Sequence, residues 1–437
     1  MIRSLLVAAG ALMLAQGASA QPPPQAASTD AAPLTLESAI AQARTNSQVL
    51  QAAQTAARIA SEDRVQARAG LLPTVNGLLQ YIYTQPNGTL SGVFVPNDGP
   101  KVYNAYGTAH ADLVSPVKWA DYRATAAAEA TAKAKADVAA RGLVATVVQS
   151  YYTLVAAVRK ATSAQQGVTE AQQFLEITDR QERGGEVAHS DVVKAQIQVA
   201  QRRRDSQDAD LVALKARLAL SVLVFPDFRD NFTVVDDLQN IPVLPPLETL
   251  KTMATENNPD LKAAEATVQQ EASGVTSARS GYLPSVTFDY WYGIEANQFA
   301  IYNPQGNRLL GSSASVQMTV PVWNWGATQS KLRQATLRVQ QARLELSLAQ
   351  RQLLANVNAF YAEAETAQAQ VASLRTSLDL ATDSLRLTTL RYQAGEVSVL
   401  EVVDAQTTLI QARSAYNDGL VRYHTALASL QTLSGTL

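Results

Sequence analysis

The chain of 437 residues contains two copies of one pattern. Ala67-Arg68-Ala69-Gly70-Leu71-Leu72-Pro73 recurs 211 residues later as Ala278-Arg279-Ser280-Gly281-Tyr282-Leu283-Pro284, with five of the seven residues identical. Gly185-Glu186-Val187 recurs 210 residues later as Gly395-Glu396-Val397. Several matches at a nearly constant offset are not expected by chance in an alanine-rich chain, so the fold must build one structural unit twice.

The two halves cover about 34–224 and 247–437. The connector between them, 225–246, contains several prolines and therefore cannot be a continuous helix. Each half is expected to begin with one helix, 36–69 or 247–280, that ends at a Gly-x-Leu-Pro sequence.

Residues 1–20 have the pattern of a secretory signal peptide. Arg3 supplies the positive charge, Leu5 to Leu14 form a short apolar run, and Ala18-Ser19-Ala20 is a cleavage sequence. The next segment, 21–33, is rich in Pro, Ala and Gln and is predicted to be a disordered lead-in. The mature chain has no run of 18 or more apolar residues, so it either remains soluble outside the cytoplasm or enters a membrane as β-strands.

Two segments of alternating polarity follow the first helix of each half. The four strands are predicted at 74–84, 103–114, 285–295 and 313–322. A soluble sheet with one wet face would explain any one of them, but four strands of spanning length favour a membrane sheet. The aromatic residues near these strands are candidates for the membrane interface or for ordinary packing: Tyr81, Tyr83, Tyr103, Tyr290, Tyr292, Trp323 and Trp325.

A long helical hairpin follows each pair of strands. Residues 118–183 contain no proline, and a helix of about 60 residues is about 90 Å long. The hairpin tips are predicted near 184–190 and 394–398, where glycine interrupts the helical pattern. Helices of this length do not fit in a compact domain.

Four strands cannot close a membrane barrel, because open sheet edges leave unpaired N–H and C=O groups in lipid. Two copies would supply about eight strands, and a barrel of that size is filled by side chains rather than open. Three copies would supply about twelve strands, which suits a hollow helical cylinder of this length. The predicted architecture is therefore a mixed α/β homotrimer with a 12-stranded transmembrane β-barrel. A long helical barrel continues from it.

Composition excludes several other classes of protein. Lys and Arg number 36 against 38 Asp and Glu, which gives no basic footprint for a nucleic acid partner. Cysteine is absent and the three histidines lie far apart, so neither a thiolate site nor an imidazole metal site is expected. No phosphate-binding glycine loop, Gly-x-Ser-x-Gly sequence or triad spacing is present, and the chain is predicted to be neither an enzyme nor a cofactor carrier.

The chain resembles the TolC-type family of outer-membrane channels over nearly its whole mature length. The resemblance rests on the Leu34-Thr35-Leu36-Glu37 opening, the paired Gly-x-Leu-Pro sequences, the strand exits Pro116-Val117 and Pro321-Val322, and the hairpin tips from Arg183 and from Arg391. It implies a trimer in the outer membrane of a Gram-negative bacterium that extends into the periplasm. It further implies docking to a periplasmic membrane-fusion adaptor and an inner-membrane transporter of the RND or ABC type.

The resemblance also suggests roles for residues at the tips. Glu401 and Asp404, three residues apart on one helix face, match paired acidic positions of the pore constriction. Ser398 and Glu401 also form a capping-box sequence, which is a structural alternative for Glu401. Asp191 and Tyr392 match positions that hold the tip closed or simply pack there, while Val397 replaces the tip arginine of some members. The adaptor would meet Gly185, Glu186, Val187, Gly395, Glu396 and Val397.

Three functions follow from this interpretation. The first is a passive exit duct for small molecules in an efflux system, and the second is the outer-membrane channel of a type I protein secretion system. The third is a periplasmic coiled-coil scaffold with no channel activity.

Overall fold

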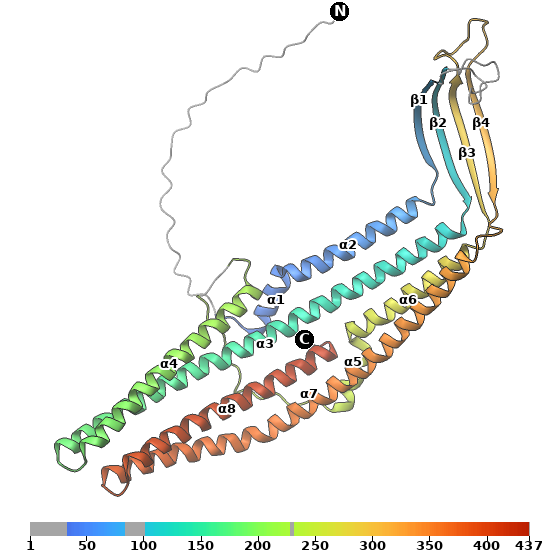
Figure 1. Cartoon of the computed structure of the whole chain (residues 1–437). Coiled ribbons are helices and arrows are strands. Elements are labelled where there is room, and N and C mark those ends of the chain that lie inside the picture. The colour runs from blue at the N-terminus through green and yellow to red at the C-terminus, as the bar shows by residue number, and fades with distance from the viewer. Residues whose placement is uncertain (1–32, 84–100, 228–230, 437) are drawn as a thin grey trace, which may run out of the picture.

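The computed structural model describes residues 33–83, 101–227 and 231–436. The molecule is elongated, with a sheet at one end and the tips of two helical hairpins at the other (Figure 1). The predicted signal peptide, 1–20, and the lead-in up to residue 32 lie outside the described residues.

The four strands form one antiparallel sheet in the order β1-β2-β3-β4. Their bounds are Thr74–Tyr83 (β1), Lys101–Val114 (β2), Ser285–Ala296 (β3) and Leu310–Thr319 (β4). The central pair, β2 and β3, joins the first repeat to the second. Strands β1 and β4 are the two edges, so among the described residues each has a neighbouring strand on only one side.

The predicted position of the last strand, 313–322, is wrong by three residues. β4 ends at Thr319, before Pro321, which has no N–H to donate to a neighbouring strand. The alternation of side chains begins earlier than predicted, at Leu310. The other three strands begin and end within two residues of the predicted positions.

Two long helices, α3 and α7, run the full length of the helical part (Figure 1). α2 and α6 accompany them beside the sheet, and α4 and α8 accompany them to the tips. The bounds are Gln48–Ala69 (α2), Pro116–Arg183 (α3), His189–Val224 (α4), Pro259–Ser280 (α6), Ala327–Gln393 (α7) and Val399–Ser434 (α8). The 68 residues of α3 span about 100 Å. Among the described residues, no helix is both long enough and apolar enough to cross a membrane.

The two predicted opening helices, 36–69 and 247–280, are each divided in the structure. The first becomes α1 (Leu36–Asn46) and α2, and the second becomes α5 (Leu247–Asn257) and α6. Asn258 is extended because Pro259 follows it, and its Oδ1 accepts hydrogen bonds from the first backbone N–H groups of α6. Ser47 caps α2 in the same way, with its Oγ 3.3 Å from Leu50 N. The prediction of continuous helices was wrong because the Ser47 and Asn258 side chains accept hydrogen bonds from backbone N–H groups that a helix break leaves without a helical partner.

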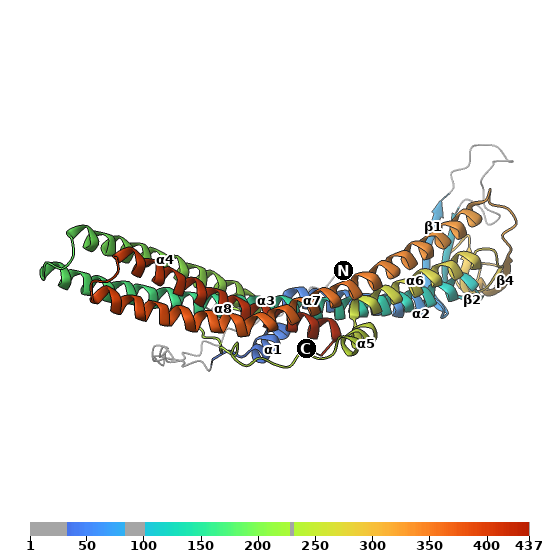
Figure 2. The same ribbon diagram turned by 90° about the horizontal axis from the view of Figure 1, so that it is seen from below.

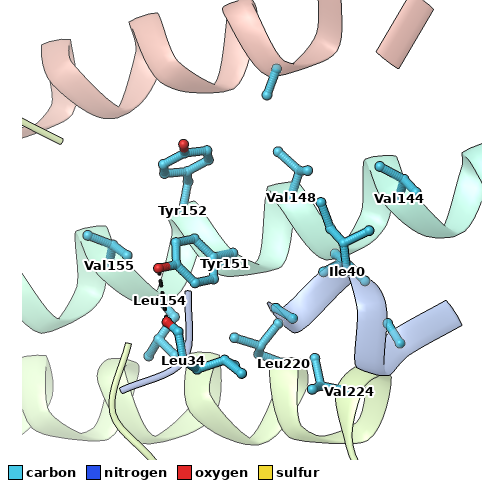
Figure 3. Close-up of a cluster of buried hydrophobic side chains, with 14 of the residues drawn as sticks. Leu34, Ile40, Val144, Val148, Tyr151, Tyr152, Leu154, Val155, Leu220 and Val224 are labelled. Atoms are coloured by element: carbon cyan, nitrogen blue, oxygen red, sulfur yellow. Dashed lines mark hydrogen bonds between the residues drawn. The ribbon is translucent and has the colours of Figure 1, made fainter. Parts of the chain in front are cut away.

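The largest cluster of buried apolar side chains lies halfway along the helices (Figure 3). Tyr151 of α3 is at its centre, and its hydroxyl lies 2.7 Å from Val235 O and 3.2 Å from Leu34 O. Burial is the main reason that the pKa of Tyr151 lies above its usual value, so the hydroxyl is a neutral donor. The cluster thus fixes the start of the first repeat against the middle of α3.

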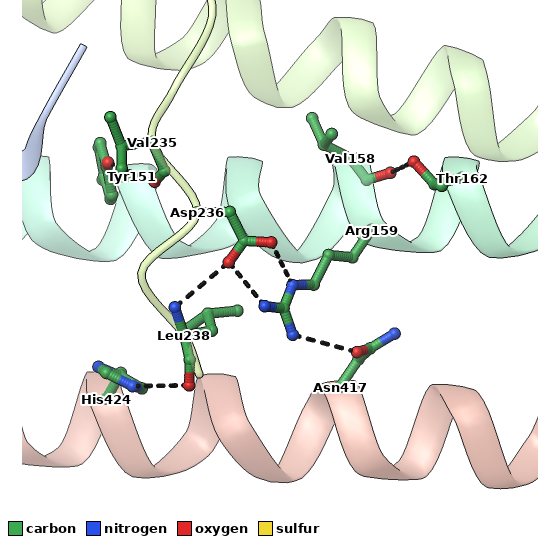
Figure 4. Close-up of polar contacts among 9 residues, drawn as sticks. All are labelled: Tyr151, Val158, Arg159, Thr162, Val235, Asp236, Leu238, Asn417 and His424. Carbon is green, nitrogen blue, oxygen red and sulfur yellow. Dashed lines mark hydrogen bonds and ion pairs between the residues drawn. The ribbon is translucent and has the colours of Figure 1, made fainter. Parts of the chain in front are cut away.

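The connector between the repeats crosses α3 and α8 at this level (Figure 4). Arg159 of α3 forms an ion pair with Asp236 of the connector, with Nη2 2.7 Å from Oδ1. Its Nη1 also donates to Asn417 of α8 at 3.3 Å. His424 of α8 lies 3.1 Å from Leu238 O. These contacts join the two repeats at mid-length. Seen from below, α1 and α5 lie on the same side of the bowed helical layer as the connector (Figure 2).

Candidate functional site

The sheet has one apolar and one polar side. On the apolar side, aliphatic and aromatic residues of neighbouring strands lie opposite one another, as Val75, Ala109 and Tyr290 do. Many of these side chains are exposed: Leu79 retains 83% and Val316 67% of its accessible surface. Such a continuous apolar patch on a protein surface marks contact with lipid or with another protein.

Aromatic rings lie near both ends of the sheet. Tyr81 and Tyr103 are 4.8 Å apart at the end far from the helices, and Phe299 lies 6.3 Å from Tyr103. At the end beside the helices, the rings of Trp323 and Trp325 are 5.8 Å apart and both are exposed.

Two of the candidate interface aromatics lie away from the ends of the sheet. Tyr290 and Tyr292 lie within β3 rather than at an end of the sheet. Phe299 was missed because it follows the alternating segment and only approaches the tyrosines in three dimensions.

The opposite side of the sheet carries polar pairs. Gln80 Oε1 accepts a hydrogen bond from Asn104 Nδ2 at 3.1 Å. His110 Nδ1 lies 2.6 Å from Asp289 Oδ1, and Asp112 forms an ion pair with Lys118 at the start of α3. A polar side opposite a lipid-facing side is the arrangement of a strand that lines a water-filled pore.

The two hairpin tips are built alike. Gly185 and Gly395 both have left-handed backbone conformations, with φ of 78° and 75°. The next residue in each tip, Glu186 or Glu396, donates its N–H back to a helix carbonyl at 2.9 Å. This is a glycine helix cap in both repeats, so the repeated Gly-Glu-Val sequence is first of all a turn. Val187 and Val397 pack against the apolar cluster behind the tips.

The predicted gate residue Tyr392 is buried, with 2% of its surface exposed. Its ring lies 5.1 Å from Phe174, and its hydroxyl donates to Thr178 Oγ1 at 3.4 Å. The pKa of Tyr392 is raised mainly by burial and to a smaller extent by the charge of Asp191. Asp191 itself pairs with Lys194 at 3.0 Å on its own helix. The structure therefore places both residues near the α3–α7 contact, but only Tyr392 bonds across it.

Arg183 and Arg391, at the ends of α3 and α7, do not join the two hairpins to each other. Arg391 pairs with Glu396 of its own tip, and Arg183 pairs with Asp179 of its own helix.

Instead, Gln181 Nε2 lies 3.4 Å from Tyr392 O and 3.3 Å from Gln393 O, which joins the end of α3 to the end of α7. Further from the tips, Glu170 of α3 forms an ion pair of 2.8 Å with Arg413 of α8. The sequence carried no signal for these pairs, since the partners are more than 200 residues apart.

The predicted constriction residues Glu401 and Asp404 are both exposed in the first two turns of α8. Glu401 Oε1 accepts from the backbone N–H of Ser398 at 3.3 Å, so the predicted capping box is present. Within the described ranges, no group of three or more His, Asp or Glu side chains is arranged to hold a metal ion.

Residues 39–224 and 250–436 match the family described as outer membrane efflux protein. The alkaline protease secretion protein AprF of Pseudomonas aeruginosa is 26% identical over 235 residues, which cover 54% of this chain and 48% of AprF. The outer membrane protein TolC of Vibrio cholerae is 26% identical over 192 residues, which cover 44% of each chain. This chain thus spans about half the length of these curated relatives.

Solved structures share the fold over more of the chain. The outer membrane channel CmeC of Campylobacter jejuni superposes with a TM-score of 0.82 and 17% identity, covering 92% of this chain and 85% of CmeC. CusC superposes with a TM-score of 0.80 and 19% identity, covering 91% of each chain. At this level of identity, the likeness concerns the fold.

Proposed function

Because the chain belongs to the outer membrane efflux protein family, as its sequence predicts, we propose that it is the outer-membrane exit duct of a tripartite export system. The observation that carries this proposal is the sheet with one exposed apolar side and one polar side, joined directly to helices about 100 Å long. A strand of ten residues is about 33 Å long. When tilted as in membrane barrels it crosses an apolar layer of about 25 Å.

The duct would be a homotrimer. A four-stranded sheet is open at β1 and β4, and three copies would close it into a barrel of about twelve strands. The helices support the same assembly, because large apolar side chains are exposed on α7 at one edge and on α2 and α4 at the other. The α7 residues include Leu337, Leu344, Leu348, Leu354, Leu380, Leu387 and Leu390, and those on α2 and α4 include Ile59, Val65, Val193, Ile197, Leu211 and Val222.

Glu401 and Asp404 would form the pore constriction. Three copies would bring six carboxylates to the periplasmic end of the tunnel, where such a ring favours cations over anions. Capping by Glu401 is compatible with this role, because its second carboxylate oxygen remains available.

Opening of the duct would separate the α7–α8 hairpin from the α3–α4 hairpin. The seam between them contains Tyr392 and the pairs Gln181–Tyr392 and Glu170–Arg413, and Asp191 lies beside it. Several buried polar atoms of this seam have no hydrogen-bond partner among the residues that the structure describes: Glu170 Oε2, Gln181 Oε1, Gln406 Oε1 and Arg413 Nη1. Water would satisfy these groups once the hairpins part, which lowers the cost of opening.

The tips, with Gly185 to Val187 and Gly395 to Val397, would dock to a periplasmic membrane-fusion adaptor. An inner-membrane transporter of the RND or ABC type would supply the energy, since the family consists of outer-membrane efflux proteins and the duct itself is passive. Outer-membrane lipid would cover the apolar side of the sheet, with the aromatic residues at its borders.

The cargo proposed first is small molecules, because the family is described as outer membrane efflux protein. Protein secretion is a second candidate, since AprF and the PrtF protein of Dickeya chrysanthemi, 24% identical over 406 residues, are named as protease secretion proteins. Deleting the gene from its bacterium distinguishes the two. Accumulation of a fluorescent dye with normal secreted proteins supports efflux, and loss of a secreted protein with normal dye export supports secretion.

The constriction is tested by the reversal potential of single channels in a KCl gradient. We expect cation selectivity in the natural protein and its loss in the double variant Glu401→Gln, Asp404→Asn. The matched control is Glu248→Gln, Glu256→Gln, which removes the same charge from exposed positions of α5. If both double variants keep the natural selectivity, the constriction lies elsewhere and Glu401 only caps α8.

A further inference from the structure

We propose that β4 of one chain pairs with β1 of the next copy in one defined register, with Met318 opposite Leu79. This inference rests on the proposed function, because it requires copies of the chain to close a barrel. It goes further in fixing which residues meet.

The occupant of the two open edges is a second copy of this chain. In the part of the chain that the structure describes, β1 and β4 each lack a neighbouring strand on one side, and unpaired backbone groups are not tolerated in lipid. Neighbouring strands alternate in direction through the sheet, so β4 and the next β1 meet antiparallel, as all other pairs do.

The register follows from the internal repeat. In the first repeat Thr74 lies opposite His110, and in the second Ser285 lies opposite Thr319. The repeated Gly-x-Leu-Pro sequences align Thr74 with Ser285, so His110 corresponds to Thr319.

The contact between the repeats then serves as the template for the contact between copies. Within the chain, Ala109 of β2 lies opposite Tyr290 of β3. In the aligned repeats Ala109 corresponds to Met318, and Tyr290 corresponds to Leu79. If the contact between copies repeats the contact between halves, Met318 therefore lies opposite Leu79 of the next copy.

The side chains agree with this register. On the apolar side, Met318 meets Leu79 and the next pair joins Val316 to Tyr81. All four of these side chains are largely exposed in the single chain. On the polar side, Gln317 meets Gln80. A slip of one residue would place Leu79 opposite a polar residue and reverse the faces of the strand.

The helices give an independent argument at the other end of the molecule. Ile177 of α3 and Val403 of α8 both pack against the buried tip cluster within the chain. The tips align Gly185 with Gly395, so the counterparts of Ile177 and Val403 are Leu387 of α7 and Val193 of α4. These are 50% and 39% exposed in the single chain. Contact between α7 of one copy and α4 of the next would cover Leu387 and Val193, just as contact between α3 and α8 within the chain covers Ile177 and Val403.

The absence of cysteine makes the register directly measurable by disulfide cross-linking. The test variant carries Leu79→Cys with Met318→Cys, and the probe for a shifted register carries Leu79→Cys with Val316→Cys. Opposite residues of two antiparallel strands alternate between hydrogen-bonded and non-hydrogen-bonded pairs, so all pairs on one face of the sheet are of the same type. The pair Gln80→Cys with Gln317→Cys lies on the other face and therefore samples the other type. Each variant is oxidised in isolated outer membranes and analysed by denaturing, non-reducing electrophoresis.

We expect covalent dimers and trimers from the Leu79/Met318 or Gln80/Gln317 pair. The shifted pair and each single-cysteine variant should remain mainly monomeric. More complete cross-linking of the shifted pair overturns the register while the trimeric duct stands.

If no pair links in protein that is trimeric and conducts ions, closure through β1 and β4 is refuted but the proposed function survives. Protein that is folded, monomeric and non-conducting refutes the proposed function and the inference together.

Discussion

Neutralising Glu170 should shift the duct toward its open state. In the closed seam its carboxylate lies 2.8 Å from Arg413, and the two side chains are 24% and 20% exposed. A charge-assisted hydrogen bond of this kind contributes about 1.5–3 kcal/mol. Within the described part of the chain, Glu170 Oε2 and Arg413 Nη1 have no hydrogen-bond partner, so the lower part of that range, about 1.5–2 kcal/mol, applies.

At about 1.4 kcal/mol per tenfold change, Glu170→Gln should raise the ratio of open to closed seams about 10- to 30-fold in each chain. If the three chains open together, the free energies add, and the effect on the whole channel is larger than a thousandfold. The assay is single-channel recording in a planar bilayer, where the variant should spend much more time at high conductance than the natural protein.

Two further variants make this prediction specific. Exchanging the charges, with Glu170→Arg and Arg413→Glu in one chain, should restore most of the closed state. Asp179→Asn removes an exposed ion pair with Arg183 within α3 and should leave gating unchanged. A Glu170→Gln channel that behaves like the natural one, or an exchanged pair that is as open as the single variant, would show that the ion pair does not hold the seam closed.

Three other outcomes follow from the structure. Burial lowers the pKa of His424, so the unfolded state takes up a proton more readily than the folded state. The contribution of His424 to the free energy of unfolding should be full above about pH 6.5 and fall in acid by up to about 1.4 kcal/mol per pH unit. Thermal unfolding of His424→Gln should therefore depend less steeply on pH. Gly293→Ala would place a Cβ 2.3 Å from Tyr106 Cα and should lower the free energy of unfolding by about 3 kcal/mol or more, which gels would show as loss of folded trimer. In the control Gly77→Ala the added Cβ has no described atom within 4 Å, so this variant should assemble normally. Gly142→Ala in the exposed middle of α3 should raise the free energy of unfolding by about 0.5–1 kcal/mol in denaturant titration, and a decrease would show that the site is not free as described.

The parts of the fold that depend on local pattern could be predicted from the sequence. Period-two alternation located the strands, and the recurrence of Gly185-Glu186-Val187 at 395–397 located both tips, because a left-handed turn needs glycine at that position. The end of β4 was misplaced because the alternation continues through Pro321 although hydrogen bonding cannot. The break at Ser47 was missed because one serine cap is a weak signal within a helical pattern.

The candidate site was predicted less completely. The constriction role of Glu401 and Asp404 rests on the resemblance and stays a prediction, whereas the capping box of Ser398 and Glu401 was visible in the sequence and is confirmed. The seam pairs, such as Gln181 with Tyr392, were not predictable, because glutamines in a long helix are common and only folding brings residues 211 positions apart into contact. The connector contacts of Arg159 with Asp236 are of the same kind.

Export through this protein requires that the assembled chain form a transmembrane duct. The most direct test is the current through a planar bilayer after addition of the purified trimer. We predict stepwise increases in current, each the insertion of one channel, carried mainly by cations. A folded trimer that inserts into the bilayer and gives no current steps, in either the natural form or Glu170→Gln, would show that it does not form such a duct.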